Sequence, residues 1–523
     1  VEEKPVAICR LKRVAADLRG DVSDRLPKAP PVKNGKRVVL IGAGASSLVV
    51  ANDLMPLGYA VTIFEALSVP GGLMRSNIPS FRLPEKVLNE EIDMILGMGV
   101  EVRYNTRIQS MKALLAEGYD AVFVGTGAPR GKDLELPGRQ EGAANIHIGI
   151  DWLESIAFGH VDTIGKRVLI IGVGNTAMDC CRSSARLGGT SIKVMARKPR
   201  SYFKASPWEL EDAEEEQIEI VVDHEPKAFV VENGRLLGME FQRYESSEGT
   251  GGQLVQKPLD VVFMPADDVI LALGQENAFP WIERDLGLAF DEEGGPVVDA
   301  VTFQSTRPDV FFGGDAAFGP KNVIWAVEHG HQAAISIDNH CRGVAVSERL
   351  PMGMNLVSAK IGLHEWSYKN DYNPGRREKM SHVDLALRFK KLDVEVEIGF
   401  SPEQVAREVE RCLNCDLQTV FIDTLCIECD ACIDVCPVLC LTITADGPEA
   451  ELRTRLNAPA DNLTQDLYAS GPLPQTRRVM VKDEDLCVHC GLCAERCPTA
   501  AWDMQKFDLR IPYAGRPACS QNG

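Results

Sequence analysis

The sequence predicts an α/β protein with two doubly wound domains, followed by a small α+β domain near the C-terminal end. Two observations predict the α/β part, because a strand, a glycine turn, a helix and a second strand follow one another at 37–65 and again at 167–197. A third observation predicts the last domain: two runs of four closely spaced cysteines lie after residue 410.

Composition excludes several classes of protein. The net charge of −19 leaves no basic surplus for binding nucleic acid. We expect no membrane span, since no run of eighteen apolar residues occurs, and no signal peptide opens the chain. The sixteen cysteines are clustered as for metal, which fits a reducing compartment and predicts a cytoplasmic protein. Because the sequence begins at Val1, it leaves open whether a segment is missing upstream.

The first glycine turn, in "RVVLIGAGASS", predicts a dinucleotide site. Gly42 and Gly44 lie between a strand and a helix, where they permit a tight turn and the approach of a pyrophosphate to the helix N-terminus. Ser47 takes the third position of this fingerprint, where glycine or alanine is usual. Glu65 closes the next strand, 21 residues after Gly44, where an acid binds ribose hydroxyls. The alternative is a glycine turn in some other α/β fold.

The second glycine turn, in "RVLIIGVGNTA", predicts another dinucleotide site, and the strand that follows it ends in basic residues instead of an acid. Such an end matches the 2′-phosphate of NADP(H) better than the 2′-hydroxyl of NAD(H). The alternative is a solvated basic turn. The candidate residues of this site are Gly172, Gly174, Asn175, Thr176, Arg197 and Lys198.

Three segments resemble the small subunit of glutamate synthase and its relatives, and the resemblance covers about residues 5–345. They are "VPGGLMRSNIPSFRLPEKVLNEEI" at 69–92, "DAVFVGTGAPRGKDLELPG" at 120–138 and "VFFGGDAAFGPKNVIWAVEHGHQAAISI" at 310–337. The second segment departs from the family, because Gly125 stands where the family's A-T-G turn has alanine.

The resemblance implies that the first site binds FAD and that Glu65 holds the adenosine ribose. It implies that Asp315 meets the ribityl-phosphate portion of FAD, although an ordinary helix N-cap is the alternative for an acid at this place. It also implies that a helix near Asn322 and Val323 directs its positive end at the flavin. The other candidate flavin-site residues are Gly42, Gly44, Ser47, Gly71, Gly72, Arg75, Thr126, Gly127 and Gly314.

The order of the motifs predicts that the second dinucleotide domain is inserted in the first, because the last flavin motif follows the second glycine turn. We therefore expect a lead-in and linker at 1–35, an FAD-binding domain at 36–150 and 275–345, and an NAD(P)-binding domain at 151–274. A connector at 346–410 has helical pieces such as "SPEQVAREVERC", and is followed by a cluster domain at 411–510 and a tail at 511–523.

Both cysteine runs read C-x2-C-x2-C-x3-C-P, the pattern of bacterial ferredoxins with two 4Fe–4S clusters. In this pattern three cysteines of one run and the fourth of the other hold each cluster. Two zinc sites would need separated pairs of ligands instead. The predicted ligands are Cys426, Cys429, Cys432 and Cys497 for the first cluster, and Cys487, Cys490, Cys493 and Cys436 for the second.

Three further cysteines, Cys412, Cys415 and Cys440, lie near these runs. We interpret them as structural. A third cluster that borrows Cys9 is the alternative.

These features predict an electron-transfer flavoprotein subunit that exchanges electrons between NADP(H) and a partner through FAD and two 4Fe–4S clusters. Similar fusions serve 2-oxoacid:ferredoxin oxidoreductases, so we expect such subunits or a ferredoxin as partners in a hetero-oligomer. The alternatives are a glutamate synthase small-subunit-type electron donor and a non-catalytic assembly subunit, whose vestigial flavin site Ser47 would indicate. The direction of electron flow depends on reduction potentials and does not follow from the sequence.

Overall fold

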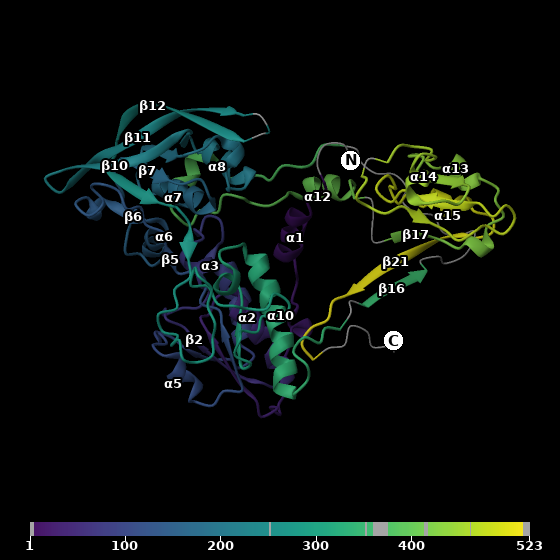
Figure 1. Cartoon of the computed structure of the whole chain (residues 1–523), viewed down its shortest axis with the longest axis horizontal. Helices are drawn as coiled ribbons and strands as arrows, with labels where there is room; N and C mark the ends of the chain where they lie inside the picture. The colour runs from purple at the N-terminus through teal and green to yellow at the C-terminus, as the bar shows by residue number, and fades with distance from the viewer. Residues whose placement is uncertain are drawn as a thin grey trace.

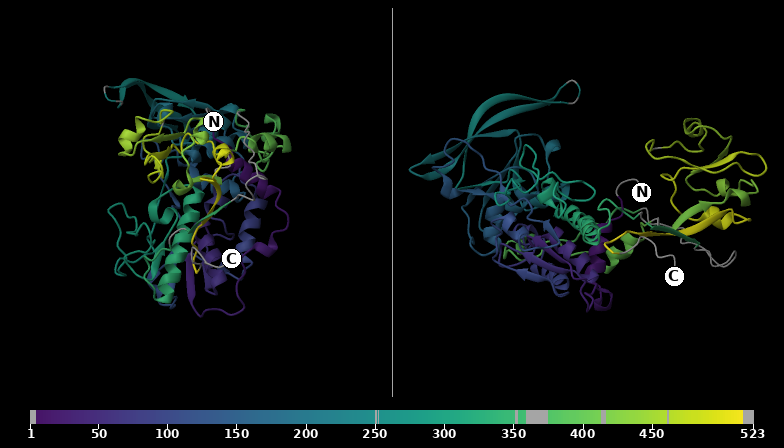
Figure 2. Two further views of the ribbon diagram at one scale, coloured as in Figure 1. Left: turned by 90° about the vertical axis from the view of Figure 1, so that its right-hand side faces the viewer. Right: turned by 60° about the horizontal axis from the view of Figure 1, so that its bottom comes forward.

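The computed structural model describes residues 5–249, 251, 253–350, 353–358, 375–412, 417–460 and 462–515. Two α/β lobes lie together, and a small cysteine-rich domain stands apart from them at the end of an extended arm (Figures 1 and 2). Within these residues no helix combines the length and apolar character that a membrane crossing requires.

The first lobe is built on a five-stranded parallel sheet with the order β15-β4-β1-β2-β3. Its central strands are apolar and buried on both faces, as parallel sheets covered by helices require. Its strands are β1 (Arg37–Ile41), β2 (Ala60–Phe64), β3 (Glu101–Arg103), β4 (Ala121–Val124) and β15 (Val310–Phe312). Its helices are α2 (Ala45–Leu54), α3 (Leu73–Ser76), α4 (Glu85–Leu96), α5 (Met111–Leu115), α9 (Asp315–Phe318) and α10 (Val323–Arg342).

The second lobe repeats this plan with a parallel sheet of order β6-β13-β7-β8-β9, to which a three-stranded antiparallel sheet is added. The parallel strands are β6 (Ile146–Ile148), β7 (Arg167–Ile171), β8 (Ser191–Met195), β9 (Glu219–Val221) and β13 (Asp268–Leu271). The helices are α6 (Gly149–Ala157), α7 (Asn175–Arg186) and α8 (Pro207–Glu215), and the antiparallel strands are β10 (His224–Glu232), β11 (Arg235–Glu248) and β12 (Leu254–Pro265).

The chain crosses between the lobes through a two-stranded ribbon of β5 (Arg130–Gly131) and β14 (Gln275–Glu276). After β14 it returns to the first sheet, where β15 pairs with β4, so the second domain is inserted in the first. The expected boundary at residue 151 is wrong, because β6 precedes it and pairs with β13 of the second sheet. The strand was missed because "IHI" is too short to show a periodicity.

The small domain has a three-stranded antiparallel sheet of order β18-β20-β19, and β17 and β21 pair beside it. Short helices α13 and α15 lie within the two cysteine runs, where each contains the third cysteine, and they contact each other. Its elements are β17 (Leu417–Phe421), α13 (Ala431–Asp434), β18 (Leu441–Thr444), α14 (Glu449–Arg453), β19 (Tyr468–Ala469), β20 (Val479–Lys482), α15 (Leu492–Arg496) and β21 (Trp502–Arg510).

The connector and the two chain ends are more ordered than the sequence indicated. Helix α12 (Pro402–Val409) forms as expected, and its capping box of Ser401 and Gln404 explains where it begins. Strand β16 (Gly353–Ser358) was not expected, and it pairs with β21 to form the arm. The lead-in contains helix α1 (Ile8–Asp17), and the Ala7 amide before it donates to buried Glu408 at 2.7 Å.

The expected tail packs on the first lobe over its described part. Ala514 is buried in the core of that lobe, and the Tyr513 ring lies 5.4 Å from the ring of His331 on α10. The arm is therefore attached to the first lobe also through the residues that follow β21.

Buried charges join the two lobes. Arg82 of the first lobe pairs with Asp179 on α7, at 2.6 Å, and with Glu209 on α8. Beside them Arg182, which is 1% exposed, lies 3.0 Å from both Asp212 and Glu216. Because both carboxylates facing Arg82 are less than a tenth exposed, separating the lobes would leave them without that partner.

We expect Arg82→Met to destabilise the protein by about 3 kcal/mol, because removing one partner of a buried ion pair leaves the other charge uncompensated. Thermal unfolding of the variant should begin well below that of the unaltered protein. The control is Arg243→Met, which breaks an exposed pair with Asp260 and should leave the unfolding temperature nearly unchanged, because solvent screens exposed ion pairs. Equal effects of the two substitutions would contradict this role of Arg82.

Candidate flavin, nucleotide and cluster sites

The predicted flavin-site loops meet at one edge of the first sheet, where strands β1, β2, β4 and β15 end. A Cβ on Gly42, at φ +91°, would lie 2.8 Å from the carbonyl oxygen of Gly125, and one on Gly72 would lie 2.9 Å from the Cα of Gly44. Glycine is therefore required at both positions, and the bare backbone leaves room for a ligand. Together these loops form the flavin cradle, which fits a dinucleotide.

The two departures from the family pattern, Ser47 and Gly125, compensate each other. Ser47 is fully buried, and a Cβ on Gly125 would lie only 2.2 Å from its Oγ. The serine hydroxyl thus fills the space that an alanine at 125 would need. The substitution at the fingerprint's third position is accommodated by the turn after β4, so it does not indicate a damaged site.

Glu65 and Arg75 both stabilise the loops of this site. The Glu65 carboxylate accepts hydrogen bonds from the amides of Ala43, at 2.7 Å, and Leu67, at 2.8 Å. Arg75 donates through Nε to the Pro70 carbonyl oxygen at 2.6 Å. Arg75 therefore braces the glycine loop, while contact of either side chain with FAD stays a prediction.

The segments that follow β4 and β15 contribute polar groups to the flavin cradle that fit a ligand. The Thr126 Oγ1 is buried without a hydrogen-bond partner among the described residues. Gly314 has φ +61°, and burial raises the pKa of the Asp315 carboxyl that follows it. Asn322 caps the 20-residue helix α10 by accepting from the Trp325 amide at 3.2 Å, so the helix begins where the sequence predicted.

The second glycine turn has the same construction between β7 and α7. A Cβ on Gly172, at φ +126°, would lie 2.2 Å from the carbonyl oxygen of Ala272. Arg197 and Lys198 are exposed after β8, and neither forms an ion pair with another described residue. Arg200, three residues on from Arg197, is already paired with Glu214. Two cations thus remain accessible at the strand end where a nucleotide ribose would lie.

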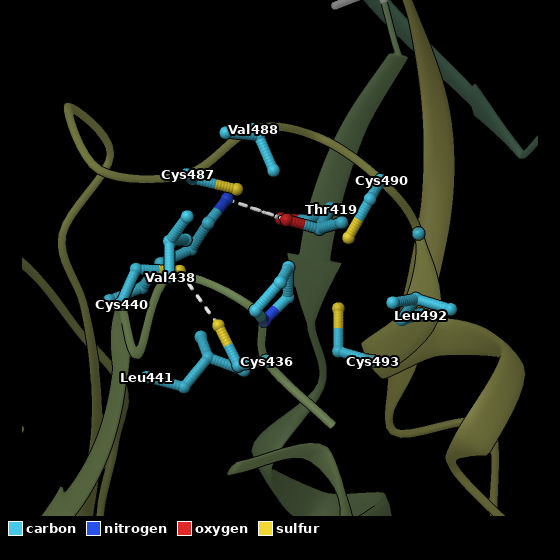
Figure 3. Close-up of a pocket in the computed structure, with 13 residues that line it drawn as sticks. Thr419, Cys436, Val438, Cys440, Leu441, Cys487, Val488, Cys490, Leu492 and Cys493 are labelled. Carbon is cyan, nitrogen blue, oxygen red and sulfur yellow. Dashed lines mark hydrogen bonds between the residues drawn. The ribbon is translucent and has the colours of Figure 1, made fainter. Parts of the chain in front are cut away.

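The eight predicted cluster ligands line two separate cavities. Cys426, Cys429, Cys432 and Cys497 line one, the first cradle, and Cys436, Cys487, Cys490 and Cys493 line the other, the second cradle. Figure 3 shows the four sulfurs of the second cradle pointing toward a common space. Each set combines three cysteines of one run with the fourth of the other, which is the donor set of a 4Fe–4S cluster.

The second cradle is also lined by Cys440, which we interpreted as structural, and by Lys482, which the sequence did not single out. Cys440 lines it, and its hydrogen bonds lower the pKa of Cys436 to about 6 and that of Cys487 to about 5. Lys482 also lines it: burial acts to lower its pKa, but the charges of Cys487 and Glu484 raise it above the ordinary value. An alignment of the two cysteine runs could have drawn attention to both residues, because it pairs each of them with an equivalent residue near the first run.

The other cysteines lie elsewhere. Cys9 and Cys412 are exposed, and Cys415 lies outside the described residues. Whether they bind iron stays untested.

Comparison with protein families matches three models to this chain. They are pyridine nucleotide-disulphide oxidoreductase at residues 74–330, an NAD(P)-binding Rossmann-like domain at 40–94 and a 4Fe–4S dicluster domain at 425–501. The last match contains all eight cysteines of the two cradles.

Among curated proteins, the small chain of NADPH glutamate synthase from Azospirillum brasilense is 30% identical over 65% of this chain and 74% of its own length. The chain belongs to the glutamate synthase small-chain family. The beta subunit of an NADP(+)-dependent formate dehydrogenase from Moorella thermoacetica is 33% identical over 79% of this chain, which spans 59% of that relative. The fold also matches FprA of Mycobacterium tuberculosis, at 17% identity and a TM-score of 0.50, over 59% of this chain and 85% of that one.

These findings confirm the predicted family, the two-lobed α/β fold with its ferredoxin-type domain, and the oxidoreductase class. They also confirm the cofactor set of FAD, a nicotinamide nucleotide and two 4Fe–4S clusters. The roles of individual residues at the sites stay predictions.

We expect Gly125→Ala to lower the affinity for FAD about tenfold, because overpacking against Ser47 costs about 1–3 kcal/mol. The double variant Ser47→Ala/Gly125→Ala should bind FAD more tightly than the single one, since it removes the nearest obstructing atom. Flavin titration of the apoprotein measures both affinities. Gly20→Ala, in open space, is the control. Undiminished affinity in Gly125→Ala would contradict the compensation.

Proposed function

We propose that this chain is the nicotinamide-linked subunit of a larger complex and exchanges electrons between NADP(H) and a partner enzyme or ferredoxin. The observation that supports this most directly is the presence of both dinucleotide cradles and both four-cysteine cradles on one chain. FAD, when bound, exchanges hydride with a nicotinamide and single electrons with iron–sulfur clusters. The chain thus has the parts for converting between two-electron and one-electron transfer.

NADP(H) is the proposed nucleotide because of charge at the end of β8. Arg197 and Lys198 are exposed there, so both can meet a 2′-phosphate. Lys198 lies 5.3 Å from the ring centre of Tyr202, which positions its ammonium near the turn. The names of the related formate dehydrogenase and glutamate synthase subunits, which both specify NADP, support the same choice.

The proposed partner is the catalytic subunit of an oxidoreductase that releases or takes single electrons, such as a 2-oxoacid:ferredoxin oxidoreductase. The names of the relatives support a hetero-oligomer, since both are parts of larger enzymes. A formate-oxidising partner is a second candidate, favoured by the similarity over 79% of this chain. The clustered thiols favour a reducing compartment, so we propose a cytoplasmic location.

The two alternatives are less well supported. An electron donor of the glutamate synthase type would leave the C-terminal dicluster domain without a stated role. A non-catalytic assembly subunit conflicts with the intact flavin cradle, in which Ser47 and Gly125 fit each other.

We expect the double variant Arg197→Ala/Lys198→Ala to raise the KM for NADPH about ten- to a hundredfold, because losing the charge-assisted contact with the 2′-phosphate costs roughly 1.5–3 kcal/mol in all. The KM for NADH should stay the same, since that nucleotide has no 2′-phosphate. Steady-state kinetics with an artificial acceptor measure both values. Arg200→Ala, which removes a cation already paired with Glu214, is the matched control. An unchanged KM for NADPH would rule out this role.

We expect Cys490→Ala to separate the two halves of the activity. The substitution removes a thiolate from the second cradle but leaves both dinucleotide lobes intact. NADPH oxidation with a two-electron dye should therefore survive, whereas turnover with the protein partner should collapse. Iron analysis should fall from about eight atoms per chain toward four. Wild-type turnover with the partner in a chain shown to lack that cluster would mean that the partner takes electrons directly at the flavin.

A further inference from the structure

The two cluster cradles can be compared position by position, because the cysteine runs repeat with a shift of 61 residues. Cys426 corresponds to Cys487, and the shift extends to the flanking strands β17 and β20 and to the residues after each proline. Equivalent residues line the two cradles at most positions. Apart from the four cysteines, the residues at these equivalent positions differ in identity, so two similar cavities can differ in their electrostatics.

The largest difference is Lys482, since the equivalent residue of the first cradle is Phe421. Lys482 is 1% exposed, and its Nζ donates to the Thr419 Oγ1 at 2.6 Å, a bond drawn as a dashed line in Figure 3. Nζ also pairs with Glu484 at 2.9 Å. An acid stands at the equivalent place near the first cradle, Asp423, so the carboxylate is common to both and the buried cation is not.

A second difference is a hydrogen-bond donor. Cys440 lines the second cradle, whereas Ala501 takes the equivalent position in the first. The Cys440 Sγ lies 3.5 Å from the Sγ of Cys436, and the Cys440 side chain is 5% exposed (Figure 3). Cys487 is a second neighbour of this thiol, whose single proton is donated to one of the two ligand sulfurs at a time. Two ligand sulfurs of the second cluster thus have a thiol neighbour. The first cradle lacks this thiol but has a hydroxyl of its own, because the Thr499 Oγ1 lies 3.7 Å from the Cys497 Sγ where the second cradle has Val438.

The charges that line the cradles differ in sign. Asp430 lines the first cradle, and Gly491 is its equivalent in the second. The charged residue that lines the second cradle is Lys482. Two further acids of that segment, Asp483 and Asp485, do not line the cradle.

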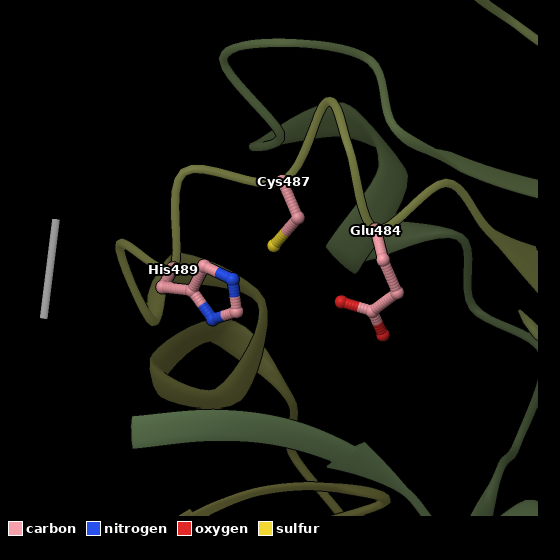
Figure 4. A group of neighbouring side chains, drawn as sticks. All are labelled: Glu484, Cys487 and His489. Carbon is pink, nitrogen blue, oxygen red and sulfur yellow. The ribbon is translucent and has the colours of Figure 1, made fainter. Parts of the chain in front are cut away.

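One of the two residues between the first two cysteines of each run also makes the second run less acidic than the first. Glu428 of the first run corresponds to His489 of the second. One side-chain atom of each of His489, Glu484 and Cys487 lies within 4.8 Å of the other two, and Figure 4 shows the three side chains grouped together. The second run thus replaces a carboxylate with an imidazole close to a cluster ligand.

We infer that Lys482 and Cys440 tune the second cluster, held by Cys436, Cys487, Cys490 and Cys493, to the higher reduction potential of the two. Reduction adds negative charge, which a buried cation and hydrogen bonds to the ligand sulfurs stabilise. An electron shared by the pair therefore resides on the second cluster, and the first is the low-potential member. The inference deepens the proposed function and rests on both clusters being present, but it does not depend on NADP(H) or on the partner.

The test is an equilibrium redox titration of the full, cluster-loaded chain, followed by electron paramagnetic resonance and made without nucleotide. Two one-electron waves are expected. Lys482→Met and Cys440→Ala should each shift only the higher wave downward, by about tenfold in the reduction equilibrium constant, or about 59 mV. Cys440→Ser, which keeps a donor, should shift it less.

Two further variants identify which redox wave belongs to which cluster. Ala501→Ser places a donor in the first cradle and should raise only the lower wave. Cys490→Ala should abolish the higher wave. If Lys482→Met does not load its second cluster, the smaller change Cys440→Ala decides the question.

The inference is overturned if Lys482→Met or Cys440→Ala shifts the lower wave. It is also overturned if neither substitution shifts any wave in chains that contain eight irons, or if Cys490→Ala removes the lower wave. None of these readouts involves nucleotide oxidation. A chain with the predicted potentials but no exchange with NADP(H) would contradict the proposed function alone.

Discussion

The relative position of the two dinucleotide lobes depends on a network of buried charges at their contact. The Arg186 side chain is fully buried, its guanidinium carbon lies 3.9 Å from the ring centre of Phe81 in the first lobe, and it pairs with Glu216 at 2.7 Å. The connector joins the same network, because Arg388 pairs with Glu215 at 3.0 Å. Buried ion pairs fix geometry, since parting them leaves charges without partners. Hydride exchange needs a nicotinamide and a flavin held in one alignment, and this network supplies the rigid frame for it.

The cluster domain follows a different constraint. Each cradle takes its fourth cysteine from the other run, so the two runs must fold together as one unit with approximate internal symmetry. Departures from that symmetry lie in the side chains around the same donor set of four cysteines. Lys482 and Cys440 on one side, and Phe421 and Ala501 on the other, give two similar cavities different electrostatics. The direction in which electrons settle can therefore be set without changing the fold.

Local patterns in the sequence predicted the parts that local forces determine. Both glycine turns, the helix near Asn322 and the helical piece in "SPEQVAREVERC" lie where the sequence indicated. Pairing between distant segments could not be predicted in this way: β16 and β21 meet across about 150 residues, and neither has a strong alternation of its own. The same holds for Ser47 and Gly125, whose departures looked like defects until their contact explained both.

The central claim is that a nicotinamide site and two clusters on one chain exchange electrons with each other, although the arm holds the small domain away from the lobes (Figures 1 and 2). The most direct measurement mixes anaerobically prereduced protein with NADP+ and follows the cluster signals by freeze-quench electron paramagnetic resonance at several protein concentrations. The account predicts that the signals disappear as NADPH forms, at a rate independent of protein concentration. Clusters that stay reduced while NADPH forms, or a rate that rises with protein concentration, would contradict transfer within the chain.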